Sequence, residues 1–206
     1  MKFKDIAEFA LGHIEPDAQT LKIASLLLID TLGVAAGAAN MHAGVIARNY
    51  AARFMTSTQK RDSAHMLFDG REVSITGAAF AMATQIDNLD AHDGYNPTKG
   101  HIGCAVVPAL CALGEQIPDI SGRDALIALI VAYEIAARAG IALHATVDDY
   151  HTSGAWNALG VVALASRLRQ HDLETFRHAL GIAEYHGPRS QMMREIANPT
   201  MLHDGS

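Results

Sequence analysis

Cysteine is scarce in this sequence of 206 residues, where only Cys104 and Cys111 occur. If both lie on one helix, the rise of about 1.5 Å per residue separates them by roughly 10.5 Å along the axis. That distance is beyond the reach of a disulfide. We therefore expect two reduced thiols in the core of a cytoplasmic protein.

Charged and aromatic residues are also few. Only 18% of the residues are charged and 6% are aromatic, whereas 50% are hydrophobic, which excludes an intrinsically disordered chain. Alanine is abundant and favours closely packed helices. The net charge of −6 argues against a nucleic-acid partner, which would require a basic face. It does not exclude an anionic small molecule, for which one local positive site is enough.

Uninterrupted apolar runs are short. The runs 24–29 and 32–39 are separated by Asp30, and the run 125–133 ends at Glu134. These lengths predict no membrane span. The first residues also lack the apolar stretch of a secretory signal, so we expect a cytoplasmic location.

Apolar periodicity predicts a succession of helices, with a helix start at Pro16-Asp17 and an N-cap at Ser121. Arg48 and Arg53 are expected on a solvated outer face, and Gly33 and Gly37 at a close helix contact. Residues 63–74 break the pattern, and Asp69-Gly70 predicts a two-residue hairpin turn. The fold class is all-α, a multi-helix domain with a minor β-hairpin. The expected helices are 3–11, 18–37, 44–54, 75–89, 104–115, 125–144, 155–170 and 173–184, with a short one at 190–197.

Two polar junctions precede helices and each carries a histidine. Residues 90–103, DAHDGYNPTKGHIG, form a long loop without periodicity that ends at His101, and His151 lies in the junction 147–154. Loops of this length in compact domains are usually functional or disordered. Helix N-termini bind anions and disfavour a protonated imidazole. The two histidines are therefore candidate proton acceptors for a substrate with several carboxylates, although both could be ordinary loop residues.

The long loop carries further candidates. Asp90 and Asp93 flank His92 and could orient a histidine or exchange protons themselves. A turn at Asp93-Gly94 and a solvated Asp90 are the alternative interpretation. Lys99 could pair with a substrate carboxylate or remain in water.

A weaker pattern suggests a different enzyme class. His65, His92-Asp93 and then Asp148 or Asp149 follow the order of helical HD-type metal phosphohydrolases. Against this, Gly-Tyr-Asn-Pro follows His92-Asp93, whereas such metal ligands usually project from helices. No HExxH or paired CxxC spacing is present, so the leading interpretation includes no metal.

Four segments resemble the MmgE/PrpD family. They are DTLGVAAGA (30–38), GAAFAMATQIDNLDAHDGYNPTKGHIGCAVVPALCALGE (77–115), YHTSGAWNALGVVALASRL (150–168) and PTMLHDG (199–205). The family includes 2-methylcitrate dehydratase, cis-aconitate decarboxylase and iminodisuccinate epimerase, which act on small di- or tricarboxylates without a metal or organic cofactor. The resemblance implies Asp90, His101 and His151 as catalytic residues.

The same resemblance implies substrate-binding residues and limits the reaction. Asp93, Lys99 and His203 are the expected substrate-binding residues. The spacing from Asp90 to His101 is one residue longer than in the decarboxylase branch. The decarboxylase lysine also falls near Thr200, where only His203 offers a nearby polar group. These departures argue against decarboxylation and leave dehydration and epimerisation open.

Family members are longer than this chain and are usually homodimers through the helical domain. The resemblance implies that residues 1–206 form an incomplete helical domain, without the smaller α+β domain that closes the cleft. The leading hypothesis is a lyase or isomerase that removes an α-proton, similar to 2-methylcitrate dehydratase. The alternatives are the HD-type phosphohydrolase and a non-catalytic helical scaffold.

Overall fold

A computed structural model describes residues 2–189 and confirms the all-α fold with one hairpin. The expected helix at 190–197 lies outside the described residues. The hairpin strands β1 and β2 pair antiparallel, Ala64 opposite Val73. The elements are α1 (Phe3–Leu11), α2 (Ala18–Gly37), α3 (His42–Phe54), η1 (Lys60–Asp62), β1 (Ser63–His65), β2 (Glu72–Ser74), α4 (Ile75–Leu89), η2 (Asn96–Thr98), α5 (Gly103–Gly114), α6 (Gly122–Thr146), α7 (Gly154–Leu168) and α8 (Leu173–His186).

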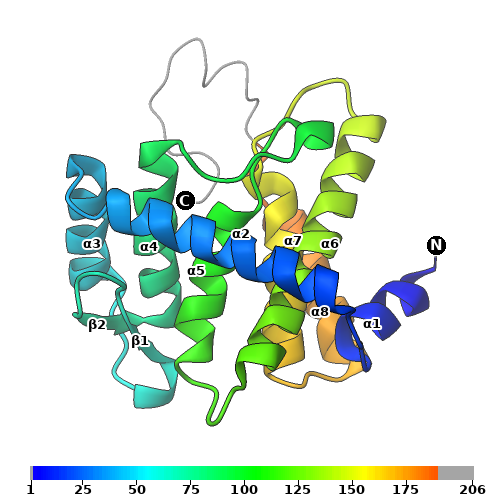
Figure 1. Cartoon of the computed structure of the whole chain (residues 1–206), viewed down its shortest axis with the longest axis horizontal. Helices are drawn as coiled ribbons and strands as arrows, with labels where there is room; N and C mark the ends of the chain where they lie inside the picture. The colour runs from blue at the N-terminus through cyan, green and yellow to red at the C-terminus, as the bar shows by residue number, and fades with distance from the viewer. Residues whose placement is uncertain (1, 190–206) are drawn as a thin grey trace.

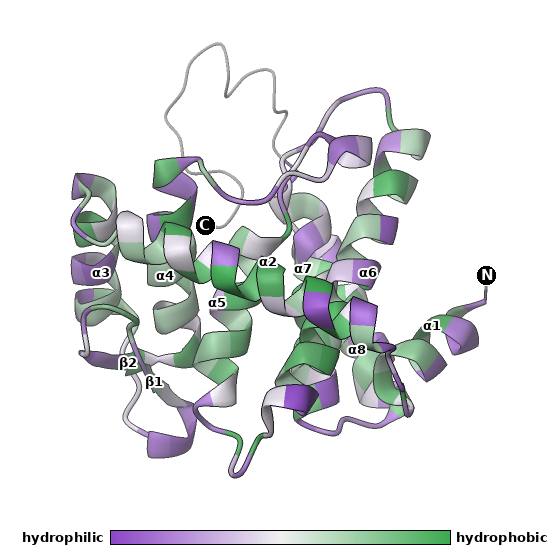
Figure 2. Ribbon diagram, in the orientation of Figure 1, coloured by the Kyte–Doolittle hydropathy of each residue, from purple (hydrophilic) through white to green (hydrophobic). Residues whose placement is uncertain are grey.

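Helix α5 is the centre of the domain. It packs against α4 on one side and against α6 and α7 on the other, while α2 crosses α4, α5 and α6 on one face (Figure 1). Most of its residues are buried, and Figure 2 shows hydrophobic residues along α5 and α6. The hairpin packs with α3 and α4, and α1 packs on α6, α7 and α8. The loops entering α5 and α7 therefore lie at the same end of the bundle (Figure 1).

Helix starts follow the local sequence closely. The Asp17 side chain accepts a hydrogen bond from the Thr20 N–H at the start of α2, and Ser121 accepts one from Asp124 at the start of α6. Each cap satisfies a main-chain N–H that has no partner within its helix. The predicted helix start at Pro16-Asp17 and the predicted N-cap at Ser121 are thus confirmed.

Small residues allow close helix contact, though only in part where it was expected. A Cβ at Gly160 of α7 would lie 2.7 Å from the Ala132 oxygen of α6. A Cβ at Gly37 would lie 3.4 Å from Leu89 Cδ2 of α4, whereas a Cβ at Gly33 would meet no atom within 4 Å, so the predicted contact is wrong at Gly33. The glycine that the packing requires belongs to the α6–α7 pair, whose backbones approach too closely for a side chain.

The hairpin turn also differs from the prediction. The strands are joined by residues 66–71 rather than by a two-residue Asp-Gly turn, with positive φ at Phe68 and Gly70. Asp69 instead binds the Arg71 side chain, with its Oδ1 2.6 Å from Arg71 Nε. This hydrogen bond is the main cause that lowers the pKa of Asp69.

Arg48 lies in the interior and not on a solvated face, which corrects the expectation for α3. Its residue exposure is 7%, and its Nε lies 3.2 Å from Asp69 Oδ2. Its other nitrogens donate to the Ala39 carbonyl, at 2.6 Å, and to Gln85 Oε1. The Arg48 guanidinium on α3 therefore connects three other parts of the fold: the segment after α2, helix α4 and the connection between the hairpin strands.

Two helices are long and apolar enough to cross a bilayer by length and composition alone. They are α2 and α6, although the interrupted apolar runs predicted no such segment. Core helices of globular proteins pass the same test. In α6, 44% of the most apolar stretch is buried inside the domain, whereas only 22% of the corresponding stretch of α2 is buried. Helix α2 thus keeps much of its apolar surface outside the described core.

Replacing Arg48 by alanine is expected to lower the free energy of unfolding by about 1–3 kcal/mol, because it leaves the buried Gln85 Oε1 and the Ala39 carbonyl without this donor, while Asp69 keeps its pair with Arg71. Arg53→Ala is the matched control on the same helix. Arg53 stacks on the Phe54 ring, and its loss is expected to cost less than about 1 kcal/mol. Urea denaturation measures both, and equal losses would contradict the structural role of Arg48.

Candidate active site

The predicted loop between α4 and α5 is confirmed, and it has defined internal structure. The turn η2 lies within it, and the Tyr95 N–H donates to the Gly100 carbonyl at 2.7 Å. Asp90 is the C-cap of α4 in the left-handed conformation, with φ 51°. The loop thus holds its polar residues in defined positions between two buried helices.

His101 lies directly before α5, as predicted, and its surroundings fix its tautomer. Its Nδ1 lies 2.6 Å from the Asp93 carbonyl oxygen, which can only accept. In the neutral ring the proton therefore resides on Nδ1, and Nε2 is the basic nitrogen. The first turn of α7 holds the His101 main chain: its N–H donates to Ser153 Oγ at 3.0 Å, and its carbonyl accepts from Asn157 Nδ2 at 2.7 Å.

His151 lies directly before α7 and has the same ring arrangement. Its Nδ1 is 2.8 Å from the Asp149 carbonyl oxygen, so its basic nitrogen is also Nε2. Its main-chain N–H donates to His144 Nε2 at 3.2 Å. Burial is the largest effect that lowers the pKa of His144, and the neutral ring can accept this hydrogen bond. The hydroxyl of the neighbouring Tyr150 donates to the Lys99 carbonyl, which joins the two histidine-bearing loops.

Asp90 lies beside His92 and His101. One oxygen or nitrogen from each of these three side chains falls within 4.8 Å of the others. The rings of His92 and His101 pack together with their centroids 4.1 Å apart. Asp90 is exposed and His101 half-buried, whereas His92 is buried. The structure therefore brings together two of the three predicted catalytic residues, Asp90 and His101. The third, His151, is two residues before the Ser153 that binds His101.

Asp93 faces the start of α5. Its Oδ1 accepts from the Gly103 N–H at 2.9 Å, and the Tyr133 and Thr31 hydroxyls lie beside it. Burial dominates and raises the pKa of Asp93, while the Gly103 hydrogen bond acts in the opposite direction. A Cβ at Gly103 would lie 2.6–2.7 Å from all three side-chain oxygens. The glycine thus leaves the space that this buried polar cluster occupies.

The remaining candidates are arranged differently. Lys99 is exposed and donates from Nζ to Asn96 Oδ1 at 2.8 Å. His203 lies outside the described residues. The HD-type pattern does not assemble, because His65 pairs with Glu115 at 2.5 Å, at the C-terminal end of α5. The twelve residues of α5 separate that end from the His92 region by about 18 Å.

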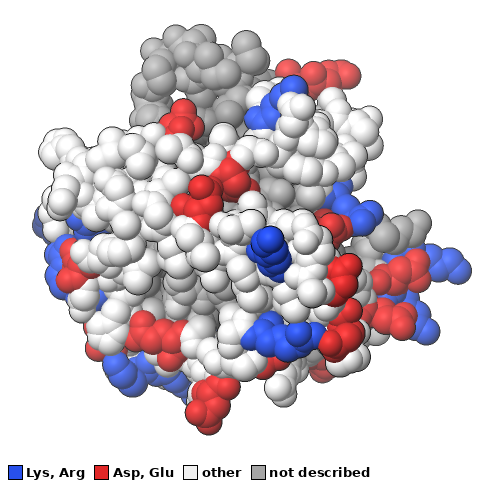
Figure 3. Space-filling view, in the orientation of Figure 1, with Lys and Arg blue, Asp and Glu red and all other residues white. Residues whose placement is uncertain are grey.

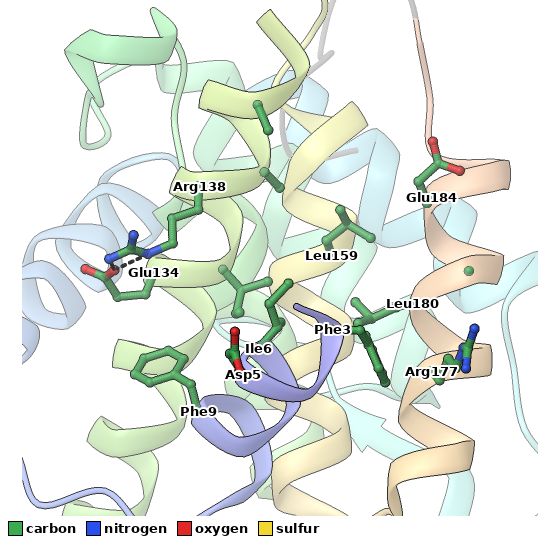
Figure 4. A pocket seen from close by; sticks show the side chains of 14 residues that line it. Phe3, Asp5, Ile6, Phe9, Glu134, Arg138, Leu159, Arg177, Leu180 and Glu184 are labelled. Carbon is green, nitrogen blue, oxygen red and sulfur yellow. Dashed lines mark hydrogen bonds and ion pairs between the residues drawn. The ribbon is translucent and has the colours of Figure 1, made fainter. Parts of the chain in front are cut away.

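Two cavities in the described part of the chain are not lined by these histidines, although the smaller one reaches Tyr95 and Ile102 of the loop that carries His101. One of about 730 Å³ lies between α1, α6, α7 and α8, and one of about 370 Å³ between α2 and α6. Asp90, His101 and His151 line neither. Figure 4 shows the larger cavity with a mostly apolar wall and Arg138 paired with Glu134 at its edge. Arg138 and Arg177 are the cations on this wall, and Arg138 is engaged by Glu134. The candidate site stays at the polar junctions because the predicted catalytic residues lie there and not in this cavity.

Sequence reasoning missed the residues that position the histidines. Ser153 and Asn157 hold the His101 main chain, and Tyr133 flanks Asp93. Ser153 and Asn157 are 52 and 56 positions from His101, so no local pattern links them. A polar pair at the start of an apolar helix is the one signal that could have identified them.

Asp93→Asn is expected to stabilise the protein near neutral pH. Burial raises the pKa of Asp93 in the folded state, so its ionised form opposes folding as pH rises through that pKa. Asparagine keeps an oxygen for the Gly103 N–H and has no such pH dependence. Urea denaturation at neutral pH and near about pH 4 should show an advantage that shrinks toward acid. An advantage that grows toward acid would contradict the assignment, and Asp148→Asn is the exposed control.

Comparison with known proteins identifies the family. Residues 4–205 match the MmgE/PrpD N-terminal domain. Over 120 residues the chain is 33% identical to cis-aconitate decarboxylase of Mus musculus, a match that covers 54% of this chain but only 24% of that protein. The match therefore spans about a quarter of the length of that protein. The chain belongs to the MmgE/PrpD family and carries its N-terminal domain.

Proposed function

We propose that this domain contributes the proton-transfer residues of a lyase or isomerase that acts on a small di- or tricarboxylate. The observation that carries the proposal is the matched state of His101 and His151. Each lies directly before a helix and donates Nδ1–H to a main-chain carbonyl, which makes Nε2 the basic nitrogen. Asp90 beside His101 supplies a second acid–base group.

Substrate binding would rely on the starts of α5 and α7. Main-chain N–H groups and the helix dipole at such ends attract carboxylates. Lys99 lies in the same loop as His101 and can add a positive charge if it exchanges Asn96 for the substrate. Asp93 supports the start of α5 through the Gly103 N–H, so its contribution to substrate binding is through the position of this helix.

The proposed reaction begins when Nε2 of one histidine removes the proton from the carbon beside a substrate carboxylate. The electron pair of the C–H bond passes into the carboxylate as an enolate, stabilised by main-chain N–H groups and Lys99. In dehydration, the proton taken by the histidine passes through Asp90 to the departing β-hydroxyl, and water leaves. In epimerisation, the second histidine returns a proton to the opposite face of the same carbon. A dehydratase similar to 2-methylcitrate dehydratase is the leading form.

The domain arrangement is part of the same proposal. The match to cis-aconitate decarboxylase covers only a quarter of that protein, and the candidate site lies outside both described cavities. We infer that a further domain of a longer protein covers Asp90, His101 and His151 and excludes water. This region then forms an incomplete helical domain that needs the closing part for turnover.

The test is proton NMR in D₂O on the full-length protein with methylcitrate, citrate, cis-aconitate, malate and iminodisuccinate. Deuterium at an α-carbon or a new alkene signal is expected. His101→Ala and His151→Ala should each lower the rate by about 10²–10⁴-fold, the usual contribution of a general acid or base. His178→Ala is the control, because this α8 side chain is 75% exposed.

Full activity in both histidine variants would refute the assignment of the base. A folded protein that leaves the whole panel unchanged would favour a non-catalytic scaffold. Formation of itaconate with loss of CO₂ from cis-aconitate would instead place the protein with the decarboxylase relative. The panel therefore distinguishes the three reaction types in one experiment.

We also propose a homodimer formed through α2. Ile23, Leu26 and Ile29 are 48%, 57% and 65% exposed on this helix. Figure 3 shows uncharged side chains over most of the face that α2 crosses, with a few charged ones among them, and Figure 2 shows hydrophobic and hydrophilic residues mixed along this helix. A second copy of the same apolar stripe is its simplest complement in a two-fold interface.

Ile29→Glu should convert the full-length protein from dimer to monomer in light scattering coupled to size exclusion. Leu173→Glu is the matched control, because Leu173 is 51% exposed on a different helix. A monomeric wild type would refute the dimer. If Ile29→Glu kept the molecular mass of the dimer but melted at a lower temperature, the apolar stripe of α2 would instead be covered by another segment of the same chain.

A further inference from the structure

A buried group of three different metal-ligating side chains lies next to the candidate site. Asp87 is in the last turn of α4, His92 in the following loop, and Cys104 in the first turn of α5. We propose that these three side chains bind one zinc ion, with a water molecule as the fourth ligand. This property goes beyond the carboxylate chemistry and does not depend on it.

The distances are close to those of a zinc site. One ligand atom from each residue lies within 4.8 Å of the others, and His92 Nε2 is 3.5 Å from Asp87 Oδ1. Zinc bonds of about 2.0–2.3 Å in a tetrahedron place ligand atoms roughly 3.3–3.8 Å apart. The His92–Asp87 distance already falls in this range. The Cys104 sulfur lies within 4.8 Å of both, so a side-chain adjustment would bring it into the same range.

The chemistry of the three ligands favours zinc over magnesium and calcium. The two hard cations take oxygen ligands, whereas thiolate and imidazole suit zinc and its neighbours. Three protein ligands and one water are the usual composition of an open zinc site. Two deprotonated acidic ligands, Asp87 and Cys104, would balance the two charges of the ion.

Burial is the second observation that supports the site. Cys104 is fully buried, and the side-chain exposures of His92 and Asp87 are 0% and 4%. Buried ionised groups are usually paired or bind metals, because removal from water is unfavourable for a lone charge. Asp87 and His92 pair with each other at 3.5 Å, and a dication among the three side chains would balance the charges of the Asp87 carboxylate and a Cys104 thiolate.

The second cluster, Asp90, His92 and His101, gives the ion a path from solvent. It shares His92 with the buried group, and its Asp90 is exposed. An ion that first meets Asp90 can therefore pass to His92 and then inward. Once bound, it would join α4 to α5 directly across the loop that carries Asp93 and His101, and so fix that loop.

The experiment is equilibrium dialysis of the full-length protein against zinc chloride, with metal analysis, and a parallel titration with cobalt chloride. We expect one zinc per chain and a higher melting temperature with zinc, because a ligand that binds only the folded state stabilises it. Cobalt should produce the intense near-ultraviolet band of a thiolate–cobalt bond. This band tests Cys104 in the unmodified protein, without relying on a variant that could misfold.

Cys104→Ser and His92→Asn should each weaken zinc binding at least tenfold, and Cys104→Ser should also abolish the cobalt band. Cys111→Ser is the matched control on the same helix. Cys111 is outside the cluster, and burial raises the pKa of its thiol to about 11. The Cys111→Ser variant should bind zinc as tightly as the wild type.

Three results would overturn the proposal. One is the absence of zinc from the dialysed protein, and another is a cobalt band that persists in Cys104→Ser. The third is zinc binding lost in His101→Asn but retained in Cys104→Ser, which would place the ion in the outer cluster. Because each readout is binding or stability, a failure of the carboxylate reaction leaves this test unaffected.

Discussion

The candidate site depends on the contact between the first turn of α7 and the main chain of His101. Ser153 accepts from the His101 N–H, and Asn157 donates to its carbonyl. The contact is possible only because Gly100 has no side chain: a Cβ there would lie 2.3 Å from Ser153 Oγ and 2.8 Å from the Trp156 ring. The starts of α5 and α7 are thereby fixed side by side, together with the histidine that precedes each.

The helical framework could be predicted because its signals are local. Apolar periodicity indicated every described α-helix, and Asp17 and Ser121 marked two starts that their caps confirm. Arg48 was misjudged because its partners, Asp69 and Gln85, come from elements that its own helix does not specify. The prediction for Gly33 was wrong for the same reason, because a close contact at a glycine depends on which helix packs against it.

The site was predictable as a location and not as an arrangement. Polarity and missing periodicity singled out both junctions, and His101 and His151 do precede helices. The tautomers depend on the carbonyls of Asp93 and Asp149, whose direction is set by how each loop folds back. The buried side of Asp93 and the packing of His92 on His101 likewise arise from tertiary contacts. His203 remains a prediction beyond the described residues.

The left-handed conformations of Asp90 and Lys99 have a consequence for how this loop would change under selection. Their φ angles are 51° and 53°, a region that glycine adopts without steric penalty and other residues at a cost of about 1 kcal/mol. Selection for stability alone would drive both positions toward glycine. The loop therefore keeps two side chains in a backbone conformation that its own folding does not favour, and any role proposed for Asp90 has to outweigh that cost.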